Sequence, residues 1–215
     1  MQLKVMKNFL IDLDGVILNL EYDNFFWQEH IPQVYAKIHK VSFTQAQSIT
    51  RQIFNYKRKT MDWYDIDYWS NMLAIDIKKE KERNMEKIKL LKGAEDFLKN
   101  LSKNNKNLFL ITNAHKKTLN VKMKKYDIRK YFKSIVCSHE LNYIKEEIQF
   151  WYILKNKLQI SFEDSVLIED TLDNLIAAQS AGLKNLVYIS KKKSLSRIID
   201  PLTTEYFSDL SSAFQ

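Results

Sequence analysis

The sequence predicts an α/β protein whose doubly wound parallel sheet is interrupted by an inserted all-helical segment. A short apolar run at residues 9–13 leads into an Asp-Gly turn, which is typical of a buried parallel strand. From residue 93 onward, apolar runs of strand length alternate with helical patterns, as in sheets built from strand–helix–strand units. Residues 20–90 break this rhythm and contain no convincing strand, which predicts a helical insertion.

The insertion is rich in aromatic residues and opens its clearest helix with a capping signal. Ser42 and Gln45 form a capping-box pattern before a helix predicted to run to Lys57. The charged stretch 78–89 then returns the chain to the sheet. We therefore expect a core of residues 1–19 and 91–215, with the insertion at 20–90.

The remainder of the core is predicted as four helix–strand pairs, with Gly182 as a helix stop. The helices are expected at 93–104, 115–126, 145–158 and 172–181, and the strands at 107–112, 134–138, 165–169 and 185–189.

Composition and charge exclude several classes of protein. The chain is 45% apolar but contains no apolar run of the roughly 18 residues needed to cross a membrane. Its net charge of +8 comes from lysines interleaved with acids, a pattern more typical of solvated helical faces than of a nucleic-acid interface. The single cysteine, Cys137, excludes an internal disulfide. No signal peptide precedes the first strand, so we expect a cytoplasmic protein with neither a nucleic acid nor a membrane as partner.

Polar residues with chemical potential follow successive strands of the predicted sheet. The carboxyl ends of parallel strands meet at one edge, so residues far apart in the sequence converge there. Each of these residues has a task in phosphoryl transfer. The set comprises Asp12 and Asp14 at the end of the first strand, Thr112 and Asn113 at the end of the second, Lys145 at the start of the helix after the third, and Glu169 and Asp170 at the end of the fourth.

The chemistry assigns a role to each position. Asp12 is the expected nucleophile, and Asp14 the acid that protonates the leaving oxygen and later activates water. Thr112 and Asn113 are expected to donate hydrogen bonds to phosphoryl oxygens, and Lys145 to neutralise their charge. A magnesium ion (Mg2+), which prefers oxygen ligands, is expected to bind at the acidic residues. Its expected ligands are Asp12, Asp170 and the backbone carbonyl of Asp14, and Glu169 is expected to hold one of the waters that the ion retains.

In this order the four groups of residues resemble those of the haloacid dehalogenase superfamily, over essentially the whole chain. The resemblance implies a Rossmann-like core with an inserted cap. The stretches YDNFFWQEHIP, MDWYDIDYW and ITNAH are similar to the bacterial GMP/IMP nucleotidase branch, whose members are magnesium-dependent 5′-nucleotidases. The chain departs from relatives where Ile144 and Glu146, rather than proline, flank the motif lysine, and where Glu169 replaces an aspartate.

The resemblance implies hydrolysis of a small phosphate ester, GMP or IMP, with discrimination supplied by the cap. His115 is a candidate substrate contact because it closely follows Thr112 and Asn113. Trp63, Tyr64 and Tyr68 are further candidates, because an aromatic face can stack on a purine. Two alternatives remain open: a sugar-phosphate phosphatase or phosphomutase of the same superfamily, and a non-catalytic binding protein on this fold. The sequence does not define the oligomeric state, for which a monomer is slightly favoured.

Overall fold

The computed structural model describes residues 5–189 and 204–207, which belong to two units. The core unit comprises residues 1–19, 90–113 and 127–215, and the helical unit comprises residues 20–89 and 114–126. Sequence analysis assigns residues 114–126 to the core, whereas their contacts place them in the helical unit.

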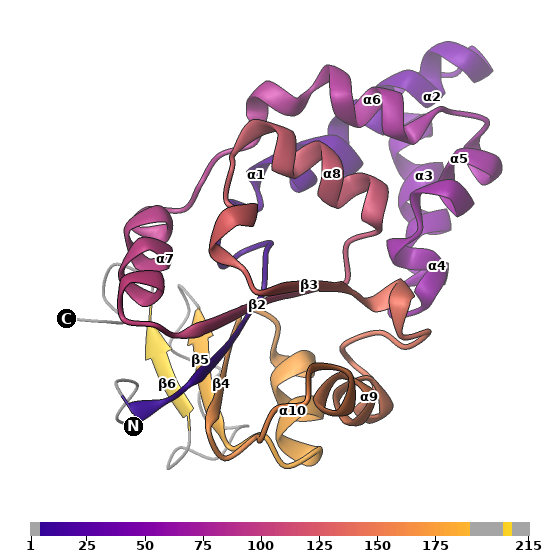
Figure 1. The fold of residues 1–215 in the computed structure, drawn as a ribbon. Coiled ribbons are helices and arrows are strands. Elements are labelled where there is room, and N and C mark those ends of the chain that lie inside the picture. The colour runs from indigo at the N-terminus through magenta and orange to yellow at the C-terminus, as the bar shows by residue number, and fades with distance from the viewer. Residues whose placement is uncertain (1–4, 190–203, 208–215) are drawn as a thin grey trace. The chain divides into compact units, whose positions relative to one another are not determined.

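The core unit contains a six-stranded sheet in which every pairing is parallel, confirming the predicted fold class (Figure 1). The spatial order is β3-β2-β1-β4-β5-β6. The strands are β1 (Asn8–Ile11), β2 (Asn107–Thr112), β3 (Ser134–Cys137), β4 (Ser165–Glu169), β5 (Asn185–Ile189) and β6 (Thr204–Phe207). Sequence analysis does not predict β6, which pairs with β5 along its length.

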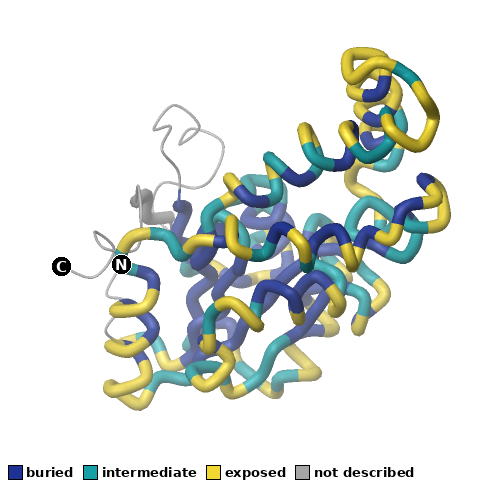
Figure 2. Tube along the Cα trace, turned by 90° about the horizontal axis from the view of Figure 1, so that it is seen from above, coloured by how far each residue is buried: buried dark blue, intermediate teal, exposed yellow. Residues whose placement is uncertain are grey.

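Helices cover both faces of this sheet (Figure 1). The helices of the core unit are α7 (Ala94–Lys103), α9 (Ile148–Leu158) and α10 (Leu172–Ser180), with short 3₁₀ turns η4 (Arg129–Tyr131) and η5 (Ser138–Glu140). One hydrophobic cluster joins alternate strand residues, such as Leu10 and Leu167, to α9 and α10. The strands β1 and β4 are buried along their whole length. Figure 2 shows buried and exposed residues along the chain in dark blue and yellow.

The strand order places β1 next to β4, although about 150 residues of chain separate them. Ile11 pairs with Ile168, and the Asp12 N–H donates to the Ile168 carbonyl at 3.0 Å. Sheets of this topology bind ligands where the chain reverses its direction of travel across the sheet, which here is between β1 and β4. The residues that directly follow these two strands therefore meet at the edge expected to bind a ligand.

The helical unit contains no strand among its described residues. Its elements are α1 (Glu21–Phe25), a π-helical turn η2 (Phe26–His30), α2 (Ile31–His39), α3 (Phe43–Lys57), α4 (Met61–Tyr64), α5 (Ile66–Leu73), α6 (Ile77–Arg83), η3 (Met85–Lys87) and α8 (Lys116–Lys125). The predicted capping box of Ser42 and Gln45 starts α3. Aromatic rings form much of the interior: Trp27, Phe54 and Trp69 make mutual edge-to-face contacts.

Ion pairs attach α8 to the rest of the helical unit. Lys117 binds both carboxylate oxygens of Asp67, at 2.6 and 2.7 Å, and Lys124 binds Glu82 at 3.0 Å. Lys122 is buried and binds Asp23 at 2.5 Å. The lysines of α8 therefore fasten this segment to acids contributed by residues 20–89.

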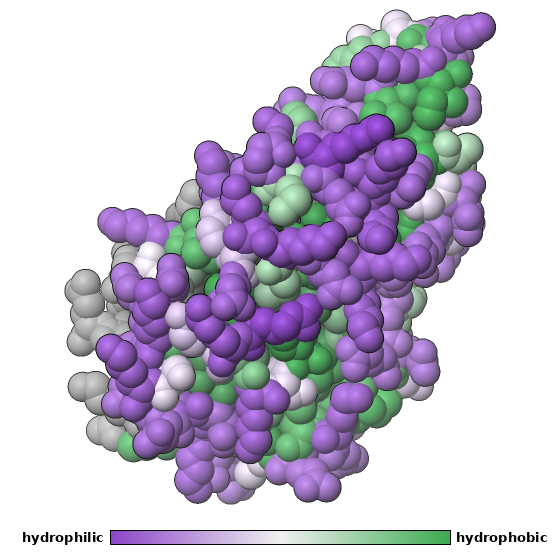
Figure 3. Space-filling view, turned by 45° about the horizontal axis from the view of Figure 1, so that its top comes forward, coloured by the Kyte–Doolittle hydropathy of each residue, from purple (hydrophilic) through white to green (hydrophobic). Residues whose placement is uncertain are grey.

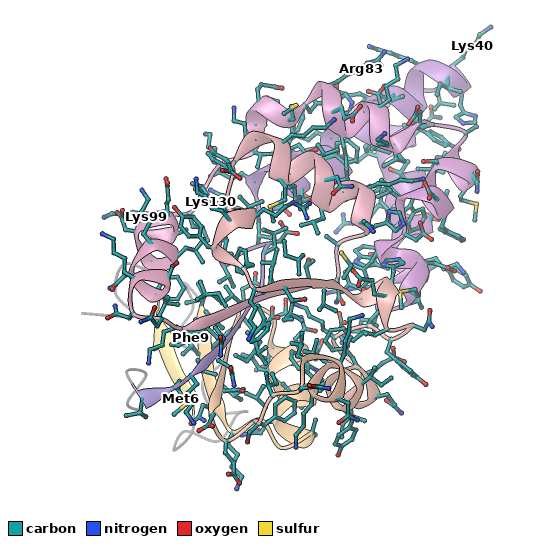
Figure 4. The ribbon with its side chains drawn as sticks, in the orientation of Figure 1. Met6, Phe9, Lys40, Arg83, Lys99 and Lys130 are labelled. Carbon is teal, nitrogen blue, oxygen red and sulfur yellow. The ribbon has the colours of Figure 1, made fainter. Side chains whose placement is uncertain are left out.

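Basic residues are carried by several elements of the described chain. The face drawn in Figure 3 is mostly hydrophilic. Labelled basic residues lie on separate elements: Lys40 after α2, Arg83 at the end of α6, Lys99 on α7 and Lys130 in η4 (Figure 4). Within residues 5–189 and 204–207, every helix is too short or too polar to cross a bilayer.

Candidate active site

The carboxyl ends of β1 and β4 bring three carboxylates and one lysine together in the core unit. Asp12, Lys145 and Glu169 are buried, at 5%, 1% and 0% exposure. The Lys145 ammonium contacts the Asp12 carboxylate directly and donates to Glu169 Oε2 at 2.6 Å and to the Ile111 carbonyl at 3.2 Å. A buried charge is costly unless it is paired, and here one ammonium joins two carboxylates from neighbouring strands.

The Glu169 carboxylate is fixed through both of its oxygens. Oε2 accepts from Lys145, and Oε1 accepts the backbone N–H groups of Asp170 and Thr171 at 3.1 and 3.0 Å. The Thr171 hydroxyl in turn donates to Asp170 Oδ1 at 3.1 Å. The start of the turn after β4 therefore holds both acidic side chains in defined orientations, and no sequence motif pointed to Thr171.

Gly15 makes room for Asp170. Its φ of +85° is in the left-handed region, and a Cβ built there would lie 1.9 Å from Asp170 Oδ2. Any side chain at this position would displace the carboxylate. The Asp-Gly turn predicted after the first strand thus leaves a space that the Asp170 carboxylate fills.

The carboxylates form a donor set that suits a divalent cation. Asp12, Glu169 and Asp170 each offer an oxygen, and these oxygens lie within 4.8 Å of one another. Burial, the Glu169 charge and the Asp14 charge raise the pKa of Asp12 to about 8, against the lowering effect of Lys145. Burial, Glu169 and Asp12 raise the pKa of Asp170 to about 9. A bound cation would relieve this repulsion, so the residues present fit magnesium.

Lys145 keeps its proton in this cluster. Burial lowers the pKa of Lys145, but the carboxylates of Asp12 and Glu169 outweigh it and raise the pKa above its ordinary value of 10.5. The lysine is therefore a fixed positive charge.

The sequence predicts Lys145 at the start of a helix, and that prediction is wrong, because α9 begins at Ile148. The Lys145 carbonyl instead accepts the Trp151 indole N–H at 2.7 Å.

The remaining predicted core residues lie on the same strand ends. Thr112 is the last residue of β2 and is buried, and Asn113 follows it. Asp14 lies in the turn after Asp12 and is half-buried. The Asn113 side chain is bound to the loop that carries Lys145, through the Lys145 N–H at 2.9 Å and Glu146 at 2.8 Å.

The predicted substrate contacts His115, Trp63, Tyr64 and Tyr68 belong to the helical unit and are half-buried. The Trp63 carbonyl accepts the Trp69 indole N–H at 3.0 Å, and the Tyr68 ring meets Trp69 edge-on at 5.0 Å.

A second set of possible metal donors lies in the helical unit, at Asp65, Asp67 and His115. These donors are only half-buried, whereas two of the three donors in the core unit are buried. Asp65 accepts the N–H groups of Asp67 and Tyr68 in the first turn of α5, Asp67 binds Lys117, and His115 Nδ1 accepts the Lys117 N–H. The carboxylates of the core unit are the stronger candidate for a metal site, because their burial and mutual repulsion raise the pKa of Asp12 and of Asp170, and a cation would relieve that repulsion.

Comparisons with known proteins agree with this geometry. A family model described as haloacid dehalogenase-like hydrolase matches residues 9–188. The GMP/IMP nucleotidase YrfG of Escherichia coli is 28% identical over 185 residues, which is 86% of this chain and 83% of that protein.

Two solved structures share the fold. A HAD phosphatase from Thermococcus onnurineus superposes with a TM-score of 0.81 at 22% identity, covering 97% of this chain and 96% of its own. The HAD-hydrolase YfnB of Bacillus subtilis, whose structure is bound to magnesium, has a TM-score of 0.71 at 16% identity, with 97% of both chains covered. Because the family model spans most of the sequence, the chain belongs to the haloacid dehalogenase-like hydrolases.

Proposed function

We propose that this protein is a magnesium-dependent phosphatase that hydrolyses purine nucleoside 5′-monophosphates, GMP or IMP, through an aspartyl-phosphate. The observation that carries the proposal is the cluster of Asp12, Lys145, Glu169 and Asp170 at the β1–β4 edge. The nucleotide part rests on similarity to the E. coli GMP/IMP nucleotidase.

In this proposal Asp12 attacks the phosphorus atom with a carboxylate oxygen, and the bond from phosphorus to the ester oxygen breaks. Asp14 donates a proton to the departing alkoxide. Asp14 then accepts a proton from water as the water oxygen attacks phosphorus, and the bond from phosphorus to Asp12 breaks. The products are an alcohol and inorganic phosphate, and both aspartates return to their starting states.

Thr112 and Lys145 are the proposed groups that stabilise the phosphoryl oxygens. The Lys145 ammonium is fixed by Asp12 and Glu169, so it needs little reorganisation when charge develops during the reaction. Magnesium, held by Asp12, Asp170 and the backbone carbonyl of Asp14 with Glu169 beside them, would supply a Lewis-acid charge that offsets the carboxylates and the phosphate.

We propose that residues 20–90 act as a cap, together with residues 114–126 of the same unit. The YfnB structure is described as revealing interdomain movement, and an equivalent movement here would exclude water during the first transfer.

The core offers groups for phosphate and metal, so we assign recognition of the base to the helical unit. Stacking on an aromatic ring contributes about 1–3 kcal/mol per base in nucleic-acid binders, or roughly five- to 150-fold in affinity.

A phosphate-release screen tests the proposal. The purified protein is assayed with magnesium against GMP, IMP, AMP, CMP and glucose 6-phosphate, with Asp12→Asn as the inactive control. We expect kcat/KM to be highest for GMP or IMP and lowest for the hexose phosphate. Faster hydrolysis of glucose 6-phosphate than of either purine nucleotide would overturn the nucleotidase assignment, and release from none of the esters would overturn the phosphatase assignment.

A further inference from the structure

The Asn113 side chain is a bridge between two residues of the loop that carries Lys145. Its Oδ1 accepts the backbone N–H of Lys145 at 2.9 Å, and its Nδ2 donates to Glu146 Oε2 at 2.8 Å. Asn113 is 6% exposed, and its own carbonyl accepts the Ser138 hydroxyl at 3.3 Å. Both polar ends of the amide are therefore engaged within the protein.

The Glu146 carboxylate determines which way the amide faces. An ionised carboxylate only accepts hydrogen bonds, so the NH₂ group of Asn113 must point to Glu146. The amide oxygen then has to point to the Lys145 N–H. A hydrogen bond to an ionised acceptor is also stronger than one between neutral groups, which holds this orientation against a flip.

Lys145 is consequently held on both sides of its own backbone. The Lys145 N–H donates to Asn113 Oδ1, and the Lys145 carbonyl accepts the Trp151 indole N–H at 2.7 Å. One residue earlier, the Ile144 N–H donates to Glu147 Oε2 at 2.8 Å. The ammonium at the end of a flexible four-carbon side chain can be held reproducibly only where its backbone is fixed.

We infer that Asn113 and Glu146 are positioning residues that act on the phosphate site through Lys145. The Asn113 amide, in this assignment, orients the lysine rather than binding the phosphoryl group itself. This inference rests on the proposed phosphatase function, since it assigns the lysine to the phosphoryl oxygens.

Exchanging donor and acceptor across the pair tests the inference. Asn113→Asp keeps an acceptor for the Lys145 N–H but sets two carboxylates against each other at the Glu146 contact. Combining it with Glu146→Gln restores a donor–acceptor pair with reversed polarity and returns the pair to its original total charge. We expect the single Asn113→Asp variant to raise KM for p-nitrophenyl phosphate about tenfold or more, and the double variant to recover to within about threefold of wild type.

Direct binding of phosphate by Asn113 predicts the opposite result. An aspartate cannot donate to a phosphoryl oxygen, so the double variant would then be no better than Asn113→Asp. That result, or an unchanged KM in Asn113→Asp, would overturn the inference.

Milder variants keep the test informative should Asn113→Asp fail to fold. Glu146→Ala removes the acceptor and is expected to raise KM about tenfold, while Glu146→Gln retains an acceptor oxygen and should cost no more than about threefold. Glu147→Gln is the matched control: it removes the same charge one residue away and keeps an acceptor for the Ile144 N–H, so KM should not change. Equal KM values for wild type and Glu146→Ala would count against the bridge.

A turnover-independent measurement separates this inference from the proposed function. Calorimetric titration with inorganic phosphate in the presence of magnesium should show weaker binding in Glu146→Ala and normal binding in Glu147→Gln. A wild-type protein that binds phosphate but releases none from any ester would contradict the phosphatase proposal alone. Identical phosphate affinity in wild type and Glu146→Ala would contradict the positioning role alone.

Discussion

Replacing Asp23 with asparagine should destabilise the helical unit far more than removing an exposed aspartate from the same unit. The Asp23 carboxylate binds Lys81 at 3.0 Å and Lys122 at 2.5 Å, and each lysine side chain is 2% exposed. The Lys81 ammonium also lies 4.2 Å from the Phe26 ring centroid. The substitution preserves shape and removes the charge that both ammonium groups share.

The size of the effect follows from burial. Breaking a buried ion pair on one side costs about 3–5 kcal/mol, and because the Asp23 side chain retains 21% exposure we expect about 3 kcal/mol. For a chain of this length that corresponds to a fall in Tm of roughly 6–12 °C. Asp62→Asn is the matched control, because the side chains of the Lys57–Asp62 pair are 25% and 43% exposed, so solvent screens the pair and its loss should matter far less.

Thermal unfolding followed by circular dichroism at pH 7 measures both variants. Burial raises the pKa of Asp23, but Lys122 and Lys81 outweigh it and hold the pKa well below its ordinary value of 3.8. A depressed carboxyl pKa gives stability that is fully present above the unfolded pKa and is lost as the pH falls toward the folded pKa. The difference between wild type and Asp23→Asn should therefore be complete at pH 7 and shrink below about pH 4. Equal Tm losses for Asp23→Asn and Asp62→Asn would refute this reasoning.

Three further predictions concern the proposed reaction. Chelation should abolish turnover, and added magnesium should restore it. The pKa values of Asp12 and Asp170 are raised to about 8 and about 9, so the metal-free protein should lose stability as the pH rises from 5 to 9. Magnesium should therefore raise Tm more at pH 9 than at pH 5. Asp12→Asn should form no phosphoenzyme, whereas Asp14→Asn should slow both half-reactions and form a long-lived phosphoenzyme. Trapping of labelled phosphate on the protein measures both variants. Normal turnover of Asp14→Asn would exclude the acid–base role. Tyr68→Ala should reduce the preference for GMP over glucose 6-phosphate by roughly five- to 150-fold if the ring stacks on the base, and a loss of Tm with the substrate order unchanged would assign Tyr68 to packing.

The sheet and the residues at its edge could be predicted because their signals are local. An apolar run such as that in residues 165–169 predicts a buried strand without any information about the rest of the chain. The acids Glu169 and Asp170 at its end belong to the same short stretch of sequence. The last strand, β6, is not predicted, because Thr204–Phe207 (TEYF) opens on two polar residues and contains no continuous apolar run. Such a segment has no periodicity that separates it from a loop.

Interactions between distant residues could not be predicted in the same way. Lys81 lies in a charged stretch that is typical of a solvated face, yet it is 1% exposed because Asp23, far away in the sequence, supplies its counter-charge. The bridge from Asn113 to Glu146 likewise spans 33 residues. The apolar pattern of α9 extends close to Lys145 and predicts a helix from that residue, but the helix begins three residues later.

The membership of residues 114–126 in the helical unit limits how this protein can be re-engineered. The chain passes between the two units four times, at residues 19–20, 89–90, 113–114 and 126–127. A recombinant that exchanged only residues 20–89 for the equivalent segment of another hydrolase would leave behind Lys117, Lys122 and Lys124 without the acids that bind them. A chimera that keeps these ion pairs needs both segments from one parent, so the helical unit cannot be transplanted as one contiguous block.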